Sequence, residues 1–229
     1  MRSQRLLFIG NSATYVHDLP RMLRTLAGEA GYPLEVTTVA RGGYTLAQHA
    51  DGTTEHGRAV LAEIQKGYDL VFLQDNGNCI TTPARRLASQ QACRTLDSAI
   101  RATGGITCLY IRPPYGYALG EYSPVEQCGE LDGLFTGIAA ELGATCAFVN
   151  RAFGIAIEEL PYDLWGPDHA HLGPYGAYLA VCVFFATLFS TSSSVLSFNG
   201  LPAEAARALQ GVADAVALEE KSPRGPFKG

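Results

Sequence analysis

The chain has 229 residues, 47% of them hydrophobic and 17% charged, and its formal net charge is -5 at pH 7. These values are typical of a globular protein that is long enough to bury a sizeable core. No Pro/Ser/Gly-rich linker divides the middle of the chain, so we expect one domain over residues 1–229. Because the acidic balance gives no basic surface field, we expect no nucleic-acid partner.

The sequence shows no signal for secretion or membrane insertion. The apolar run at residues 6–9 is too brief for the core of a signal peptide. The longest apolar stretch, residues 175–189, is shorter than the ~18 residues expected of a membrane-spanning helix and is more typical of a buried helix. We therefore predict a cytoplasmic protein without a membrane span.

The cysteines are scattered and contain no CxxC pair. They are Cys79, Cys93, Cys108, Cys128, Cys146 and Cys182. A chain of this size with no visible secretion signal does not require a disulfide framework, and a reduced thiol in a strand or an apolar helix acts as a small hydrophobe. We therefore predict six free thiols.

Short apolar runs alternate with helical segments in the first two thirds of the chain. In chain order we predict a strand at 6–9, a helix at 21–30, a strand at Leu34–Ala40, a helix at 58–66, a strand at Leu70–Leu73, a helix at 83–101, a strand at Ile106–Ile111, a helix from Ser123 to Leu142 and a strand at 146–149. Asp18 supplies a capping residue for the first helix, and Pro20 supplies an early proline. The strands are apolar on both faces, which predicts a three-layer α/β/α fold with a central, mostly parallel five-stranded sheet.

The alternation stops after residue 149. A short helix and a loop rich in Pro, Tyr, Trp and Asp precede a predicted helix at 173–189, a Ser-rich stretch and a last helix at 203–218. The tail, residues 219–229, is charged and rich in Pro and Gly, and we expect it to be frayed.

Four polar clusters follow the predicted strands or close the alternating region. They are Gly10-Asn11-Ser12, Gly42-Gly43-Tyr44-Thr45, Gln74-Asp75-Asn76-Gly77-Asn78 and Asp168-His169-Ala170-His171. Ligands of open parallel sheets bind beyond the carboxyl ends of the strands, so we expect all four clusters to face one crevice.

The clusters contain the groups needed for nucleophilic catalysis. A serine hydroxyl such as that of Ser12 is a poor nucleophile until a neighbouring base takes its proton, and a histidine is suited to that role. Asp168 and His171 are three residues apart, so one turn of backbone can present both side chains, with the carboxylate orienting the imidazole. Loops after strands supply the donors that a tetrahedral oxyanion needs.

The order of these blocks resembles the SGNH (GDSL-like) hydrolase superfamily. The pattern FIGNS…LPRML…GGYTL…LQDN…DHAH…GAYLA is more specifically similar to a poorly characterised branch with a GNS first block. The resemblance implies a flavodoxin-like fold, Ser12 as the nucleophile, His171 as the base and Asp168 as its orienter. It also implies an oxyanion hole made by the backbone N–H groups of Ser12 and Gly43 and by the side chain of Asn76.

The sequence departs from the family pattern in the first and third blocks. Asn11 replaces the acid of the first block, and Gln74 and Gly77 replace the first glycine and the acid of the third. Asn78 is therefore a rival of Asn76 for the oxyanion role.

Other residues near the blocks have less specific interpretations. Tyr15, Tyr44 and Trp165 flank the predicted site in sequence and are candidates for lining an acyl or sugar pocket, although ordinary half-buried aromatics fit the same pattern. His17 and His49 are interpreted as surface or helix-end residues.

The leading hypothesis is a serine ester hydrolase that acts on a small-molecule or carbohydrate ester and needs no cofactor. GxSxG, P-loop, GxGxxG and HExxH motifs are absent. Two alternatives remain open: a metal-dependent hydrolase using Asp168, His169 and His171, and a non-catalytic binding module. An acyltransferase using Ser12 is a further variant, and the sequence specifies neither the natural substrate nor the oligomeric state.

Overall fold

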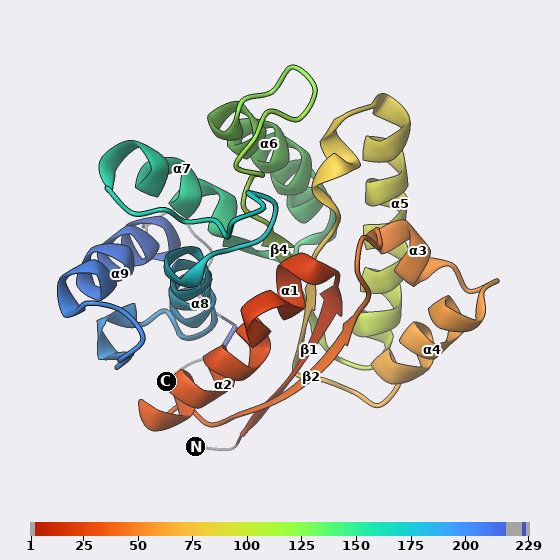
Figure 1. Ribbon diagram of the computed structural model, residues 1–229. Helices are drawn as coiled ribbons and strands as arrows, with labels where there is room; N and C mark the ends of the chain where they lie inside the picture. Colours follow the sequence, from red (N-terminus) through yellow and green to blue (C-terminus); the bar gives the residue numbers. More distant parts are fainter. Residues whose placement is uncertain (1–2, 219–225, 228–229) are drawn as a thin grey trace.

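The centre of the computed structural model, which describes residues 3–218 and 226–227, is a five-stranded sheet (Figure 1). Its strands are β1 (Gln4–Gly10), β2 (Leu34–Ala40), β3 (Leu70–Leu73), β4 (Ile106–Ile111) and β5 (Thr145–Phe148). They lie in the order β2-β1-β3-β4-β5, and every neighbouring pair is parallel. This is the flavodoxin-like order, so the predicted fold class is confirmed.

Helices cover both faces of the sheet. They are α1 (Ser12–Tyr15), α2 (Leu19–Glu29), α3 (Leu46–Ala50), α4 (Glu55–Ile64), α5 (Pro83–Ala102), α6 (Pro124–Leu142), α7 (Val149–Glu159), α8 (Pro174–Phe189) and α9 (Ala203–Ala217), with short 3-10 turns η1 (Val16–Asp18), η2 (Gly77–Ile80) and η3 (Ser193–Val195). Helices α2, α7, α8 and α9 pack on one face, and α3 to α6 pack on the other (Figure 1).

Strand alternation produces these two hydrophobic layers. Leu6 and Phe8 of β1 point into the layer under α2 and α8, whereas Leu7 and Ile9 point into the layer under α5, and all four are buried. Helix α8 is buried from residue 176 to residue 189, as expected for an apolar helix. Within the described part of the chain, no helix is long and apolar enough to cross a membrane.

Most of the predicted element boundaries agree with the structure to within a few residues. Strands Leu34–Ala40, Leu70–Leu73 and Ile106–Ile111 are confirmed, and Ser123 caps a helix that ends at Leu142. Asp18 occupies the N-cap position of α2 and Pro20 lies in its first turn, as predicted, but Asp18 has a left-handed conformation, with φ 48°, and its side chain makes no capping hydrogen bond.

The cysteine prediction is confirmed, because all six residues are free and buried. Much of the predicted frayed tail, residues 219–225 and 228–229, lies outside the described residues. Phe227 within it packs against Phe189, and its N–H donates a hydrogen bond to the Leu188 carbonyl, 3.1 Å away.

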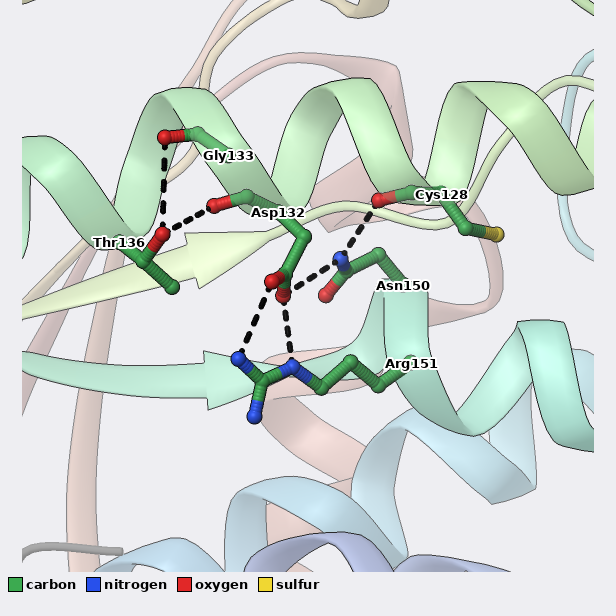
Figure 2. A network of polar contacts seen from close by, with 6 residues as sticks. All are labelled: Cys128, Asp132, Gly133, Thr136, Asn150 and Arg151. Carbon is green, nitrogen blue, oxygen red and sulfur yellow. Dashed lines mark hydrogen bonds and ion pairs between the residues drawn. The ribbon is translucent and has the colours of Figure 1, made fainter.

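A polar network joins α6 to the first turn of α7 (Figure 2). The Asp132 carboxylate accepts hydrogen bonds from Arg151 Nε at 2.6 Å and from Asn150 Nδ2 at 3.3 Å. Asn150 Nδ2 also donates to the Cys128 carbonyl at 3.1 Å. Because α7 begins directly after β5, these contacts fix the direction in which the chain leaves the sheet toward the loop that carries Asp168.

Candidate active site

Ser12 lies just beyond the carboxyl end of β1, as the first residue of α1, and is half-buried. The preceding Asn11 caps this helix, because its side-chain oxygen accepts a hydrogen bond from the Ala13 N–H at 3.1 Å. Asn11 Nδ2 donates to the Tyr44 carbonyl at 2.8 Å, and the Asn11 N–H donates to Gln74 Oε1 at 2.9 Å. The turn that presents Ser12 is therefore tied to the loops after β2 and β3.

Gln74 occupies the space beside the Ser12 turn. Its Oε1 also accepts a hydrogen bond from Thr14 Oγ1 at 2.9 Å. A Cβ atom at Gly10 would lie 2.5 Å from Gln74 Oε1 and 2.5 Å from Thr14 Oγ1, so this close approach requires glycine. The departure from the family pattern at Gln74 thus has a structural role.

The loops after β2 and β3 meet at Gly43 and Asn76. Gly43 has φ 73°, a left-handed conformation that suits glycine, and its carbonyl accepts a hydrogen bond from Asn76 Nδ2 at 3.1 Å. Asn76 Oδ1 accepts from the Asn78 N–H at 3.0 Å and from the Tyr115 hydroxyl at 3.4 Å. These contacts fix the Asn76 amide with its nitrogen toward the Gly43 loop.

Asp168 and His171 form a hydrogen-bonded pair. Asp168 Oδ2 accepts from His171 Nδ1 at 2.6 Å, and Oδ1 accepts from the backbone N–H groups of His171 and Ala170, each at 3.0 Å. The bonds from the backbone and side chain of His171, followed by that from Ala170, hold the pKa of Asp168 well below its usual range. With Nδ1–H directed at the carboxylate, Nε2 is the nitrogen left to accept a proton.

One contact links this pair to the segment after Ser12, and another fixes α1 against β4. His17 in η1 hydrogen-bonds through Nε2 to the carbonyl of Leu172, the residue after His171, at 2.8 Å. The Tyr110 hydroxyl, near the carboxyl end of β4, donates to the Ala13 carbonyl at 3.2 Å. Within residues 3–218 and 226–227, no hydrogen bond joins Ser12 Oγ to His171 Nε2, a contact that in unliganded enzymes is often long.

The three aromatic candidates differ in their surroundings. Tyr15 is exposed, and its hydroxyl lies over the Gly42 turn, 2.9 Å from where a Cβ atom at Gly42 would be. The Tyr44 ring packs edge-on against His49, with a centroid distance of 5.5 Å. Trp165 is half-buried and donates through Nε1 to the Pro114 carbonyl at 3.1 Å. Their roles toward a substrate stay predictions.

His49 lies in the last turn of α3, as the helix-end interpretation expects, but it does not lie at the surface. It is fully buried, with Nε2 hydrogen-bonded to the Gly10 carbonyl at 2.8 Å and Nδ1 to His56 Nε2 at 2.9 Å. Burial, together with the neighbouring His56, lowers its pKa to about 4, although the hydrogen bond that Nε2 makes to the Gly10 carbonyl opposes the shift. His17 is exposed, as expected.

A pocket of about 340 Å³ opens beside Gly43 and Asn76 and extends toward α5. Asp75 lies in its wall, almost fully buried, and accepts hydrogen bonds from Leu46 N at 2.8 Å, Asn76 N at 2.7 Å and Ser89 Oγ at 2.5 Å. Burial raises the pKa of Asp75 even though these donors oppose the shift. Sequence reasoning placed Asp75 in the site cluster but gave it no role.

The structure does not support the predicted alternative of a metal site. Among the described residues, no three His, Cys, Asp or Glu side chains gather as a set of metal ligands. The segment that holds Asp168 and His171 also carries His169 in a left-handed conformation, with φ 51°, whose carbonyl accepts the Gly116 N–H at 2.7 Å.

Comparison with known proteins identifies solved structures that have a similar fold. No protein-family model matches the chain, and no curated protein matches it. Among solved structures, the chain is 27% identical to a candidate SGNH hydrolase from Slackia heliotrinireducens, covering 80% of this chain and 97% of that one, with a TM-score of 0.68. A DUF4886 family protein from Bacteroides uniformis matches with a TM-score of 0.79 at 16% identity over 97% of this chain and 98% of that one. The acetylxylan esterase Axe2 from Geobacillus stearothermophilus matches with a TM-score of 0.61 at 14% identity over 87% and 97%.

The flavodoxin-like parallel sheet and these likenesses show the fold of SGNH hydrolases. In fold the chain is similar to the SGNH-like hydrolase superfamily, which supports the resemblance seen in the block pattern.

Proposed function

We propose that this protein is a serine ester hydrolase that works through an acyl-Ser12 intermediate, with His171 as the base and Asp168 as its orienter. The observation that carries the proposal is the Asp168–His171 pair, held by a 2.6 Å hydrogen bond on a segment that contacts η1, which follows Ser12 by four residues. This pairing leaves the imidazole in the tautomer that a base requires.

The proposed reaction has two stages. Ser12 Oγ attacks the ester carbonyl while His171 Nε2 takes its proton, and His171 then returns that proton to the departing alcohol. In the second stage His171 takes a proton from water as the water oxygen attacks the acyl group. The C–O bond to Ser12 then breaks, His171 returns the proton to Ser12 Oγ, and the carboxylic acid is released. The negative oxygen of each tetrahedral intermediate accepts hydrogen bonds from the N–H groups of Ser12 and Gly43 and from Asn76 Nδ2.

Asn76 is favoured over Asn78 for the oxyanion role. Its Oδ1 is occupied by two donors, and its Nδ2 already contacts the Gly43 loop. An amide nitrogen has two N–H donors, so one can serve the Gly43 carbonyl while the other serves the oxyanion.

The proposed substrate is a small-molecule or carbohydrate ester, with acetyl esters of sugars the leading class because neighbours in the comparison are acetylxylan esterases. Tyr15, Tyr44 and Trp165 are proposed to contact the substrate, since aromatic faces suit sugar rings and apolar chains. The reaction needs no cofactor, and an acyltransferase would use the same first stage with a different acceptor in the second.

The test is chemical labelling together with mutation of Ser12. An active-site fluorophosphonate should label Ser12, and Ser12→Ala should lower the turnover of an aryl acetate by about 10⁴-fold or more. Ser98→Ala, at an exposed position on α5, should leave both readouts unchanged. Labelling at another residue, or retained activity in Ser12→Ala, would overturn the assignment.

The same experiment separates the alternatives. A metal-dependent hydrolase would lose activity on chelation and ignore the fluorophosphonate. A binding module would neither turn over esters nor react at Ser12. An acyltransferase would label at Ser12 but release product faster when an alcohol acceptor is added.

A further inference from the structure

Arg112 is a buried cation without an acidic partner. It is the first residue beyond β4 and is only 4% exposed. Its Nε has no hydrogen-bond partner, and none of the residues 3–218 and 226–227 forms an ion pair or hydrogen bond with its guanidinium. Because leaving a buried charge uncompensated costs several kcal/mol, such a group points to a ligand that completes it.

Tyr115 and Gly77 pack tightly against the guanidinium. The Tyr115 ring covers it, with its centroid 4.0 Å from the Arg112 central carbon. A Cβ atom at Gly77 would lie 2.5 Å from Arg112 Nη1 and 2.7 Å from the Tyr115 ring, so only glycine allows this packing. The cation–π contact offsets part of the lost hydration but satisfies none of the five N–H donors.

The loop that follows Arg112 contacts both halves of the candidate site. On one side, the Tyr115 hydroxyl donates to Asn76 Oδ1 at 3.4 Å. On the other, the Gly116 N–H donates to the His169 carbonyl at 2.7 Å, which joins the Arg112 loop to the segment bearing Asp168 and His171. Arg112, directly after β4, therefore begins a loop that joins the Asn76 side of the site to the Asp168–His171 side.

The loop that follows Arg112 is fixed by Gln127 from α6. This buried side chain accepts a hydrogen bond from Tyr115 N at 2.9 Å and donates to the carbonyls of Tyr117 at 2.7 Å and Tyr122 at 3.2 Å. The loop whose Tyr115 ring covers the guanidinium is thereby fixed before a ligand arrives, as preorganised recognition requires.

We propose that Arg112 binds an anionic group of the substrate, so that the preferred ester carries a carboxylate or a similar oxyanion in its acyl or its alcohol part. A planar guanidinium matches a carboxylate in a paired hydrogen-bond geometry, and the anion supplies the missing counter-charge. Arg112 is then a specificity residue, and this inference rests on the proposed ester hydrolysis at Ser12.

The experiment compares matched esters that differ in one charge. The first pair is mono-4-nitrophenyl glutarate and its methyl ester, with the charge in the acyl part. The second pair is 4-acetoxybenzoate and its methyl ester, with the charge in the alcohol part. In the wild-type protein, kcat/KM should favour the anionic member of one pair by about tenfold or more, and that pair identifies the anionic side.

Mutation then tests whether Arg112 causes the preference for the anionic ester. In Arg112→Gln, kcat/KM for the anionic ester should fall about tenfold further than for its neutral partner, and Arg112→Lys should retain part of the preference. Arg207→Gln, an exposed arginine on α9, should leave the preference unchanged. An equal fall on both members of a pair would show a structural role only and overturn the proposal.

A wild-type protein without an anionic preference in either pair would also overturn it, whether or not the variants fold. Labelling of Ser12 by fluorophosphonate separates the two proposals. If Ser12 reacts and the preference is absent, the Arg112 inference fails alone, and if Ser12 does not react, the proposed function itself fails.

Discussion

Replacing His49 by glutamine should flatten the dependence of stability on pH between about pH 4 and pH 6.5. In the folded protein the neutral imidazole donates from Nε2 to the Gly10 carbonyl and accepts at Nδ1 from His56. Protonation would put a charge in a buried site and remove the acceptor at Nδ1. The pKa of His49 is therefore lowered to about 4 in the folded protein, whereas in the unfolded chain this pKa has its ordinary value of about 6.5.

The sign and size follow from proton linkage. As the pH falls below about 6.5, His49 binds a proton in the unfolded chain, whereas in the folded protein it stays neutral down to about pH 4. Unfolding therefore becomes more favourable as the pH falls. The pKa difference corresponds to about 2 kcal/mol of stability lost between pH 7 and pH 5, and about 3 kcal/mol by pH 4. The contribution is fully present above the unfolded pKa.

Urea unfolding at a series of pH values, followed by the fluorescence of Trp165, the one tryptophan of the chain, measures this loss. The His49→Gln protein should lose about 2 kcal/mol less than wild type from pH 7 to pH 5. His169→Asn, an exposed position whose φ of 51° suits asparagine, should behave as wild type. Equal losses in wild type and His49→Gln would refute the reasoning.

Three further outcomes are expected. Gly176→Ala should lower the free energy of unfolding by about 3 kcal/mol or more, because its Cβ would lie 2.2 Å from the Leu164 carbonyl oxygen. Gly211→Ala, at a helical position open to solvent, should raise the free energy of unfolding by about 0.5–1 kcal/mol. Thermal unfolding compares the two variants, and equal effects would contradict the clash at Gly176. Asp75→Asn should lower the free energy of unfolding in urea by about 2–3 kcal/mol and slow aryl acetate turnover, since the Asn76 N–H and the Ser89 hydroxyl lose a charged acceptor. An unchanged urea midpoint would show that these hydrogen bonds to Asp75 do not stabilise the fold. The six buried cysteines, whose thiol pKa burial raises, should resist Ellman's reagent in the native state and release six equivalents in denaturant, and fewer than six would indicate a disulfide.

The sheet could be predicted from the sequence because its strands are short apolar runs with sharp ends. Leu34–Ala40 stops at the Gly42 turn, and Ile106–Ile111 stops before Pro113, so pattern and structure coincide. The short helices α1 and α3 were not predicted, since four or five residues are too few to show helical periodicity.

The site could be predicted only in part, for a different physical reason. Clusters after strands follow from topology, which is why Ser12, Gly43 and Asn76 are candidates, whereas their roles come from the family resemblance and stay predictions. The burial of His49 depends on a carbonyl 39 positions away in the sequence, and no local pattern encodes such a contact. The position of Arg112 could have been noticed in the sequence. Ligands of a parallel sheet bind beyond the carboxyl ends of its strands, and Arg112 is the first residue after β4.

The hydrogen bond from His17 to Leu172 spans 155 positions of the chain and has a consequence for biosynthesis. Ser12 leaves the ribosome early, while the proposed base and the helix behind it emerge only after most of the protein has been made. A nascent chain therefore exposes an ordinary, unreactive alcohol at that position. Onset of ester cleavage would then mark the moment at which the carboxyl-terminal third docks, which makes activity a reporter of completed folding.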